Sequence, residues 1–219
     1  MNQIEIHTFR CQTMKINELV KTVDNFYPNN IVLNNPILLQ DISYKNLINR
    51  CLSANDQQNT WREFIASMRS KLTVEITEFV LLSEFNPSFI AIFLIEDYQR
   101  PNKVFYQPLQ LTLKISVLAP VYTLYFDNFD AETNKRIIRC NSINEKEKKI
   151  IDQVKFSLEK SYPEFSPFPF SKAYYMLSNL GDVSDVNKRK PYLDECIFGL
   201  YLSIHPHNIL TDKLQKIIL

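Results

Sequence analysis

The stretch Leu109–Val117 reads LQLTLKISV, and its pattern decides the fold. Apolar and polar residues alternate strictly, which is the period of a β-strand with one face against a core. A helix would instead repeat its apolar positions every three to four residues. The pattern predicts two faces: an inner one made of Leu109, Leu111, Leu113, Ile115 and Val117, and an outer one made of Gln110, Thr112, Lys114 and Ser116.

Further strands are predicted on both sides of this one. Four segments carry strand patterns, and the second of them is apolar on both faces, as in a central strand: 73–77, 89–95, 121–126 and 136–140. The connections are short, for example Asn86-Pro87 and Arg100-Pro101-Asn102. Because a parallel crossover needs a dozen or more residues, we expect neighbouring strands to be antiparallel.

Helical spacing dominates before this meander and directly after it. Apolar residues recur at helical intervals in 16–23, 44–52 and 61–72, and we expect Asn55 or Asp56 to cap the last of these. Ser142-Ile143-Asn144-Glu145 has the form of a capping box, and the helix that it opens should stop at Tyr162-Pro163.

The C-terminal part should contain a helix over 172–180, a late strand over 197–204 and a short amphipathic helix over 211–219. The chain therefore reads as one α+β domain over residues 1–219. We expect helices to about 72, a meander over about 73–140, and a helix with the late strand over about 143–219. The sheet should be mostly antiparallel, with four to six strands and helices packed on one face.

Composition excludes several function classes. The 219 residues include two glycines, Gly181 and Gly199, so neither a GxGxxG nor a GxxxxGK[ST] phosphate loop can be written. GxSxG is absent as well. With 25 basic and 24 acidic residues, the chain has no global charge that would attract nucleic acid or an anionic membrane. We expect a cytoplasmic protein with no membrane segment, no cofactor and no metal.

Several groups of residues could nevertheless carry chemistry. Carboxylates are paired at Glu96-Asp97, at Asp127 with Asp130, and at Asp194-Glu195, each expected at a strand end. The thiol of Cys196 follows the last pair, and we expect it to be a core residue because neighbouring carboxylates and burial disfavour a thiolate. A zinc site could form only if His205 and His207 met His7 and Cys11.

Two other segments allow more than one interpretation. Phe165-Ser166-Pro167-Phe168-Pro169-Phe170 is either a strap whose phenylalanines fill the core or an exposed ridge for a partner. The basic run Lys188-Arg189-Lys190 is a compact patch, but no aromatic residues lie within it as a stacking platform for bases.

The C-terminal third resembles small bacterial immunity proteins that neutralise polymorphic or type VI secreted toxins. The features that carry the resemblance are the helix end at Tyr162-Pro163, the Phe-rich linker, a polar loop, and the segment YLDECIF at 192–198. The resemblance covers about 60 residues and transfers no individual residue. It implies a cytosolic, non-enzymatic protein that binds one protein partner.

The sequence thus favours a protein-binding module of the immunity or inhibitor type, with a cognate toxin or effector as partner. Two alternatives remain: a small hydrolase or transferase that uses the strand-end carboxylates, and a structural subunit of a larger assembly. The candidate contacts are residues that we expect to be exposed at strand ends and in the basic loop, namely Asp97, Tyr98, Arg100, Asp127, Asp130, Lys188, Arg189 and Lys190.

Overall fold

The structure is a computed structural model that describes residues 14–29, 39–83, 85–96, 109–130, 135–142, 144–182 and 189–199. Two predicted features lie outside these residues: the helix over 211–219 and the residues of the possible zinc site, His7, Cys11, His205 and His207.

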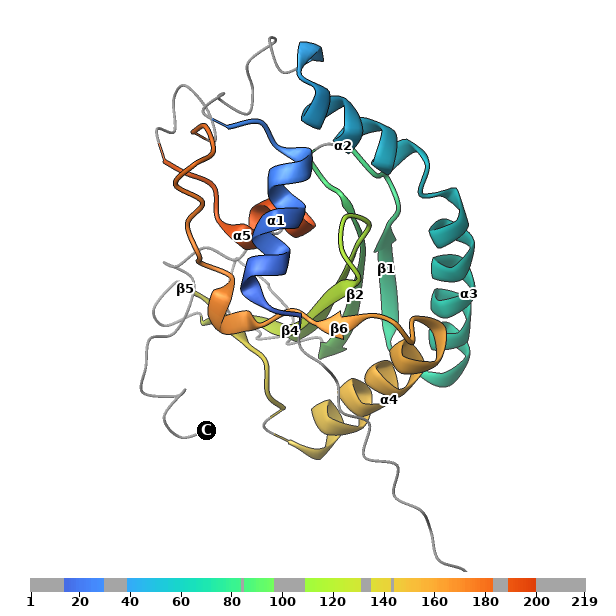
Figure 1. Cartoon of the computed structure of the whole chain (residues 1–219). Helices are drawn as coiled ribbons and strands as arrows, with labels where there is room; N and C mark the ends of the chain where they lie inside the picture. The colour runs from blue at the N-terminus through green and yellow to red at the C-terminus, as the bar shows by residue number, and fades with distance from the viewer. Residues whose placement is uncertain are drawn as a thin grey trace, which may run out of the picture.

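The described part contains one six-stranded, mostly antiparallel sheet (Figure 1). Its strands are β1 (Glu75–Phe79), β2 (Ser88–Glu96), β3 (Leu109–Ser116), β4 (Val121–Asp130), β5 (Lys135–Arg139) and β6 (Ser166–Pro167). The first five pair as antiparallel neighbours in the order of the chain, and β6 pairs in parallel with the start of β4. The five predicted strands of the meander and their antiparallel pairing are confirmed.

Five α-helices accompany the sheet in the described residues. They are α1 (Ile16–Phe26), α2 (Ile42–Leu52), α3 (Asn55–Lys71), α4 (Glu145–Ser161) and α5 (Leu193–Phe198). All five contribute side chains to one hydrophobic cluster, together with the inner face of the sheet. The first four helices confirm the sequence prediction, and the α+β class is confirmed with them.

The pairing register explains how the core is built. Leu113 of β3 lies between Ala91 of β2 and Leu124 of β4, and Leu111 likewise lies between Phe93 and Phe126. Side chains in such a row share one face of the sheet. All of these residues are buried in the main cluster, so the alternation in Leu109–Val117 identified the inner face correctly.

The sequence predicted that the opposite face of β3 would point outward, but this face is buried. Thr112, Lys114 and Ser116 are each 0 % exposed. A smaller apolar cluster, Tyr125 with Ile138, lies on this same face. Alternation separates the two faces of a strand, but it does not reveal whether the second face meets water.

Two elements of the C-terminal part differ from the prediction. Residues 172–180 were expected to form a helix. Lys172 instead ends a short 3₁₀ turn, η2 (Phe170–Lys172), and the backbone after it forms hydrogen bonds to other segments. The Leu177 amide donates to the carbonyl of Pro191, and Leu193 donates to Tyr175. Long-range backbone pairing therefore replaces the local helical bonds.

The predicted late strand over 197–204 is also wrong for the residues that the structure describes. Ile197 and Phe198 belong to helix α5, in which all six residues are buried. A short apolar run that is buried on all sides has no amphipathic period, so its pattern does not distinguish a strand from a helix. The remainder of the expected strand, 200–204, lies outside the described residues.

Helix starts differ by a few residues from the predicted caps. The N-cap of α3 is Ala54 instead of Asn55 or Asp56, because only Ser53 and Ala54 separate α3 from α2. The N-cap of α4 is Asn144, whose side chain accepts from the amide of Glu147, so Ser142 is not the cap. Asn144 fills the role that the capping-box pattern assigned to Ser142.

In the part of the chain that the structure describes, no helix has the length and apolar content needed to cross a membrane.

Candidate functional site

The sequence-predicted contact residues are only partly within the described chain. Asp97, Tyr98, Arg100 and Lys188 lie outside it, and the side chain of Asp130 is not described. The remaining three candidates are Asp127, Arg189 and Lys190, and the structure places each of them.

Asp127 was expected to be exposed at a strand end, but it is 4 % exposed in the middle of β4. The Gln110 side-chain amide donates to its carboxylate over 3.4 Å from the opposite position of β3. β4 continues for three residues beyond Asp127, so Asp127 is not at a strand end and lies between Gln110 of β3 and Ile138 of β5. As described, the carboxylate is therefore not available as a surface contact.

The charged groups of Arg189 and Lys190 both bind other residues of the same chain. Arg189 donates two hydrogen bonds to Glu195, of 2.8 and 2.5 Å, and its guanidinium lies 5.0 Å from the centre of the Tyr192 ring. Lys190 donates to the carbonyl of Leu180 over 2.7 Å and forms an ion pair of 3.3 Å with Asp182. These contacts stabilise the loop that leads into α5.

The pair Asp194-Glu195 lies in the first turn of α5 and not at the end of a strand. Both residues are at most 3 % exposed. Glu195 accepts from the backbone amide of Tyr192 at the helix start as well as from Arg189. Its carboxylate therefore caps the helix and binds the preceding loop.

Cys196 is a core residue, as its position in the sequence predicted. It is 2 % exposed. Burial raises the pKa of its thiol well above the ordinary value, and the charges of Glu195 and Asp194 raise it further. The thiol is therefore protonated near neutral pH, which disfavours a nucleophilic role.

Where its side chains are described, the Phe-rich segment is a strap whose phenylalanines pack into the core, the first of the two interpretations. Phe168 is 5 % exposed and packs edge-to-face against Phe198, with ring centres 5.2 Å apart. Phe165 packs in the same way on Tyr162 at 5.1 Å. Backbone bonds from β6 to the start of β4 hold the segment between these contacts.

A surface that sequence reasoning missed lies where the β1–β2 loop meets the end of α2. The Cys51 thiol donates to the carbonyl of Ser83 over 3.4 Å. Within two positions of Cys51 or Ser83 along the chain are three apolar side chains that are strongly exposed: Leu52 (69 %), Leu81 (83 %) and Phe85 (48 %). We call Leu52, Leu81 and Phe85 the loop surface. Large apolar side chains exposed near one another are typical of interaction sites.

Several contacts fix the backbone that carries the loop surface. Ser83 and Asn86 exchange two backbone hydrogen bonds, of 3.2 and 3.0 Å. The Asn86 side chain donates to the carbonyls of Leu81 and Ser88. Gly199 lies so close that a Cβ there would be 2.5 Å from the Phe85 carbonyl oxygen. Leu81 and Phe85 are therefore presented on an ordered scaffold.

The sequence signal for this surface was weak. Val80, Leu81 and Leu82 continue the apolar character of β1, so they resemble a strand end more than a surface. Phe85 precedes Asn86-Pro87, a turn that indicates a connection but not which side chain is exposed. Only the contact between α2 and the loop, 32 positions apart, brings the residues together.

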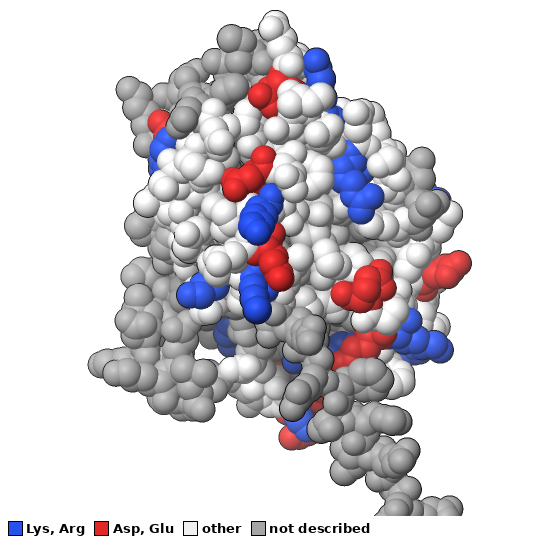
Figure 2. Space-filling model, viewed as in Figure 1, with Lys and Arg blue, Asp and Glu red and all other residues white. Residues whose placement is uncertain are grey.

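No group of three or more His, Cys, Asp or Glu residues that could hold a metal ion occurs within the described ranges. Acidic and basic side chains alternate on the face shown in Figure 2, without a large patch of one sign. Comparisons with family models, with curated proteins and with solved structures found no match for this chain.

Proposed function

We propose that this chain is a non-catalytic protein-binding module, and that the loop surface contacts its partner. The observation that supports the proposal is the exposure of Leu52, Leu81 and Phe85 beside a loop whose backbone is held by internal hydrogen bonds. Apolar anchors that enter a pocket of the partner contribute most of the binding energy in many interfaces.

Order in the loop strengthens this proposal. A flexible loop loses conformational entropy when it binds, at a cost of about 0.5–1.5 kcal/mol for each immobilised side chain. The backbone of Ser83 and Asn86 is already hydrogen-bonded in the unbound chain. Folding therefore already meets the backbone part of this cost, and the side chains of the loop surface meet theirs on binding.

The partner that we propose is a toxin or effector, which would make the chain a cytoplasmic immunity protein or inhibitor. The support is the resemblance of the C-terminal third to bacterial immunity proteins. Catalysis by carboxylates receives less support, because Asp127, Asp194 and Glu195 are all buried and Glu195 is bound by Arg189.

The test is co-expression with the protein encoded beside this chain. We expect the neighbour to be toxic alone, to be neutralised by this chain, and to co-elute with it on a sizing column. Leu81→Asp and Phe85→Asp should each weaken the complex at least about tenfold, the loss typical of an anchor residue. Neither variant should change the melting temperature, because both side chains are exposed.

Phe156→Asp is the matched control. Phe156 is 64 % exposed on α4 and is not part of the loop surface. This variant should bind and neutralise like the unmodified chain. A neighbour that is not toxic, with the chain eluting alone, would contradict the function. Full activity of both loop variants would contradict the site but not the function.

A further inference from the structure

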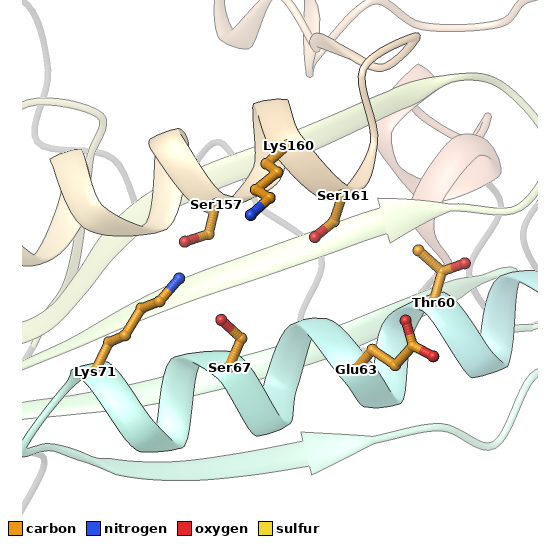
Figure 3. A pocket seen from close by; sticks show the side chains of 7 residues that line it. All are labelled: Thr60, Glu63, Ser67, Lys71, Ser157, Lys160 and Ser161. Atoms are coloured by element: carbon orange, nitrogen blue, oxygen red, sulfur yellow. The ribbon is translucent and has the colours of Figure 1, made fainter.

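A second feature of the surface is a polar groove between α3 and α4 (Figure 3). It has a volume of about 340 Å³, at the lower end of the range of small-molecule sites. Its lining comes only from these two helices: Thr60, Glu63, Ser67, Lys71, Ser157, Lys160 and Ser161. None of these residues belongs to the loop surface.

Two ammonium groups face the groove from opposite sides. Figure 3 shows Lys71 of α3 and Lys160 of α4 extending toward the gap between the helices. In the described part of the chain neither lysine forms an ion pair. Glu63 is the one carboxylate in the lining, so the groove carries an excess of positive charge.

Ser157 of α4 is a second, independent observation on this groove. It is 3 % exposed, and its hydroxyl has no hydrogen-bond partner among the described residues. In Figure 3 this hydroxyl points into the gap, near Lys160. A buried hydroxyl without a partner costs about 1–3 kcal/mol, a cost that a ligand hydrogen-bonded to Ser157 would remove.

We propose that the groove binds a phosphate monoester group. Lys71 and Lys160 supply the charge, while Ser67, Ser157 and Ser161 supply hydroxyl donors, a combination suited to the several acceptor oxygens of a phosphate. Glu63 lies at the other end of the lining, where it can accept a hydrogen bond from a hydroxyl of the esterified alcohol. The inference goes beyond the proposed protein-binding function and does not depend on it.

The experiment is a calorimetric titration of the whole chain with inorganic phosphate and with glycerol phosphate at constant ionic strength. We expect saturable binding at about millimolar concentration or below. Lys71→Gln and Lys160→Gln should each weaken it about tenfold, the effect of one charge-assisted hydrogen bond. Vesicles of phosphatidylcholine with phosphatidic acid carry the same group and reveal whether a lipid headgroup is the source.

Two further variants separate ligand binding from structure and from general charge. Ser157→Ala should weaken phosphate binding about fivefold while it preserves or raises the melting temperature, since it removes an unsatisfied buried hydroxyl. Lys155→Gln removes a positive charge two residues away, on the other side of α4. It should bind phosphate like the unmodified chain.

The proposal is overturned if no saturable binding occurs in either the soluble or the vesicle arm. It is also overturned if Lys155→Gln weakens binding as much as Lys160→Gln, which would indicate attraction to surface charge alone. A lower melting temperature in Ser157→Ala with unchanged phosphate binding would show a purely structural serine and would overturn it too.

Discussion

Arg189 donates two hydrogen bonds to Glu195, and this contact connects the polar loop to the first turn of α5. A second pair has the same arrangement: Arg139 of β5 donates two bonds of 2.7 Å to Glu147 in the first turn of α4. Both glutamates occupy the third position of their helix and are 1 % exposed at the side chain. Each pair therefore fixes a helix start to a neighbouring segment by charge-assisted bonds.

The first prediction concerns the Arg189–Glu195 pair. Arg189→Gln leaves the buried Glu195 carboxylate without its cation, and we expect it to lower the free energy of unfolding by about 3 kcal/mol. Adding Glu195→Gln should recover at least about 1 kcal/mol, because the buried charge is then removed as well. Urea denaturation measures both changes.

Lys190→Gln is the control for this pair. Lys190 is next in the chain but its ion pair with Asp182 is about one-third exposed at both side chains. Exposed pairs contribute about 0–1 kcal/mol, so this variant should have a small effect. A double variant less stable than Arg189→Gln alone would contradict the idea that the unpaired charge causes the loss.

The second prediction tests which residue caps α4. Asn144→Ala removes the side-chain acceptor for the Glu147 amide and should cost about 1 kcal/mol of the free energy of unfolding. Ser142→Ala is the matched control and should change it by less than about 0.5 kcal/mol. Equal losses of unfolding free energy from both substitutions would contradict Asn144 as the cap and would support the capping box at Ser142 that the sequence predicted.

Local periodicity explains which parts of the fold could be predicted from the sequence. Leu109–Val117 alternates because one of its faces packs on the helices, and α3 carries an apolar stripe for the same reason. Both signals come from residues that lie close together in the chain. The five strands of the meander and the first four helices were therefore predictable.

The remaining features depend on contacts between distant residues. The backbone of 175–180 bonds to 191–193 and to Asn29, and no pattern within 172–180 reveals this pairing. Similarly, Lys71 and Lys160 are 89 positions apart and share a groove only because α3 packs on α4. The sequence indicated exposed charge at Arg189, but its partner Glu195 became evident only in the structure.

The third prediction concerns the dependence of stability on pH. Burial raises the pKa of the Cys140 thiol from 9.0 to about 12, and the charge of Lys155 only partly offsets this effect. Below pH 9 the thiol is neutral in both the folded and unfolded chains, so its contribution to stability is fully present. Between pH 9 and about 12 the unfolded chain loses this proton first, and stability falls by up to about 1.4 kcal/mol per pH unit.

Cys140→Ala provides the measurement. The difference in unfolding free energy between the unmodified chain and this variant should shrink steadily as the pH rises from 9 to 10.5. The native thiol should also react slowly with iodoacetamide at pH 8, because little thiolate is present. A constant difference across this range, with rapid alkylation, would show that the thiol ionises normally.

The fourth prediction connects Gly199 to the loop surface. Gly199 has a φ of +92°, which side chains rarely adopt, and a Cβ there would lie 2.7 Å from the Asn86 Cα as well as close to the Phe85 carbonyl. Gly199→Ala must therefore displace the β1–β2 loop from the end of α5. We expect a loss of about 2 kcal/mol in unfolding free energy, from backbone strain and from the clash.

Leu81→Ala separates this effect from a simple loss of apolar contact. Leu81 is 83 % exposed, so its truncation should leave the unfolding free energy within about 0.5 kcal/mol. Gly199→Ala should lower both the stability and the affinity for the partner, although Gly199 itself is buried and cannot contact it. If Gly199→Ala folds with normal stability, then the loop can shift freely. Pre-organisation of Leu81 and Phe85 would then not contribute to binding.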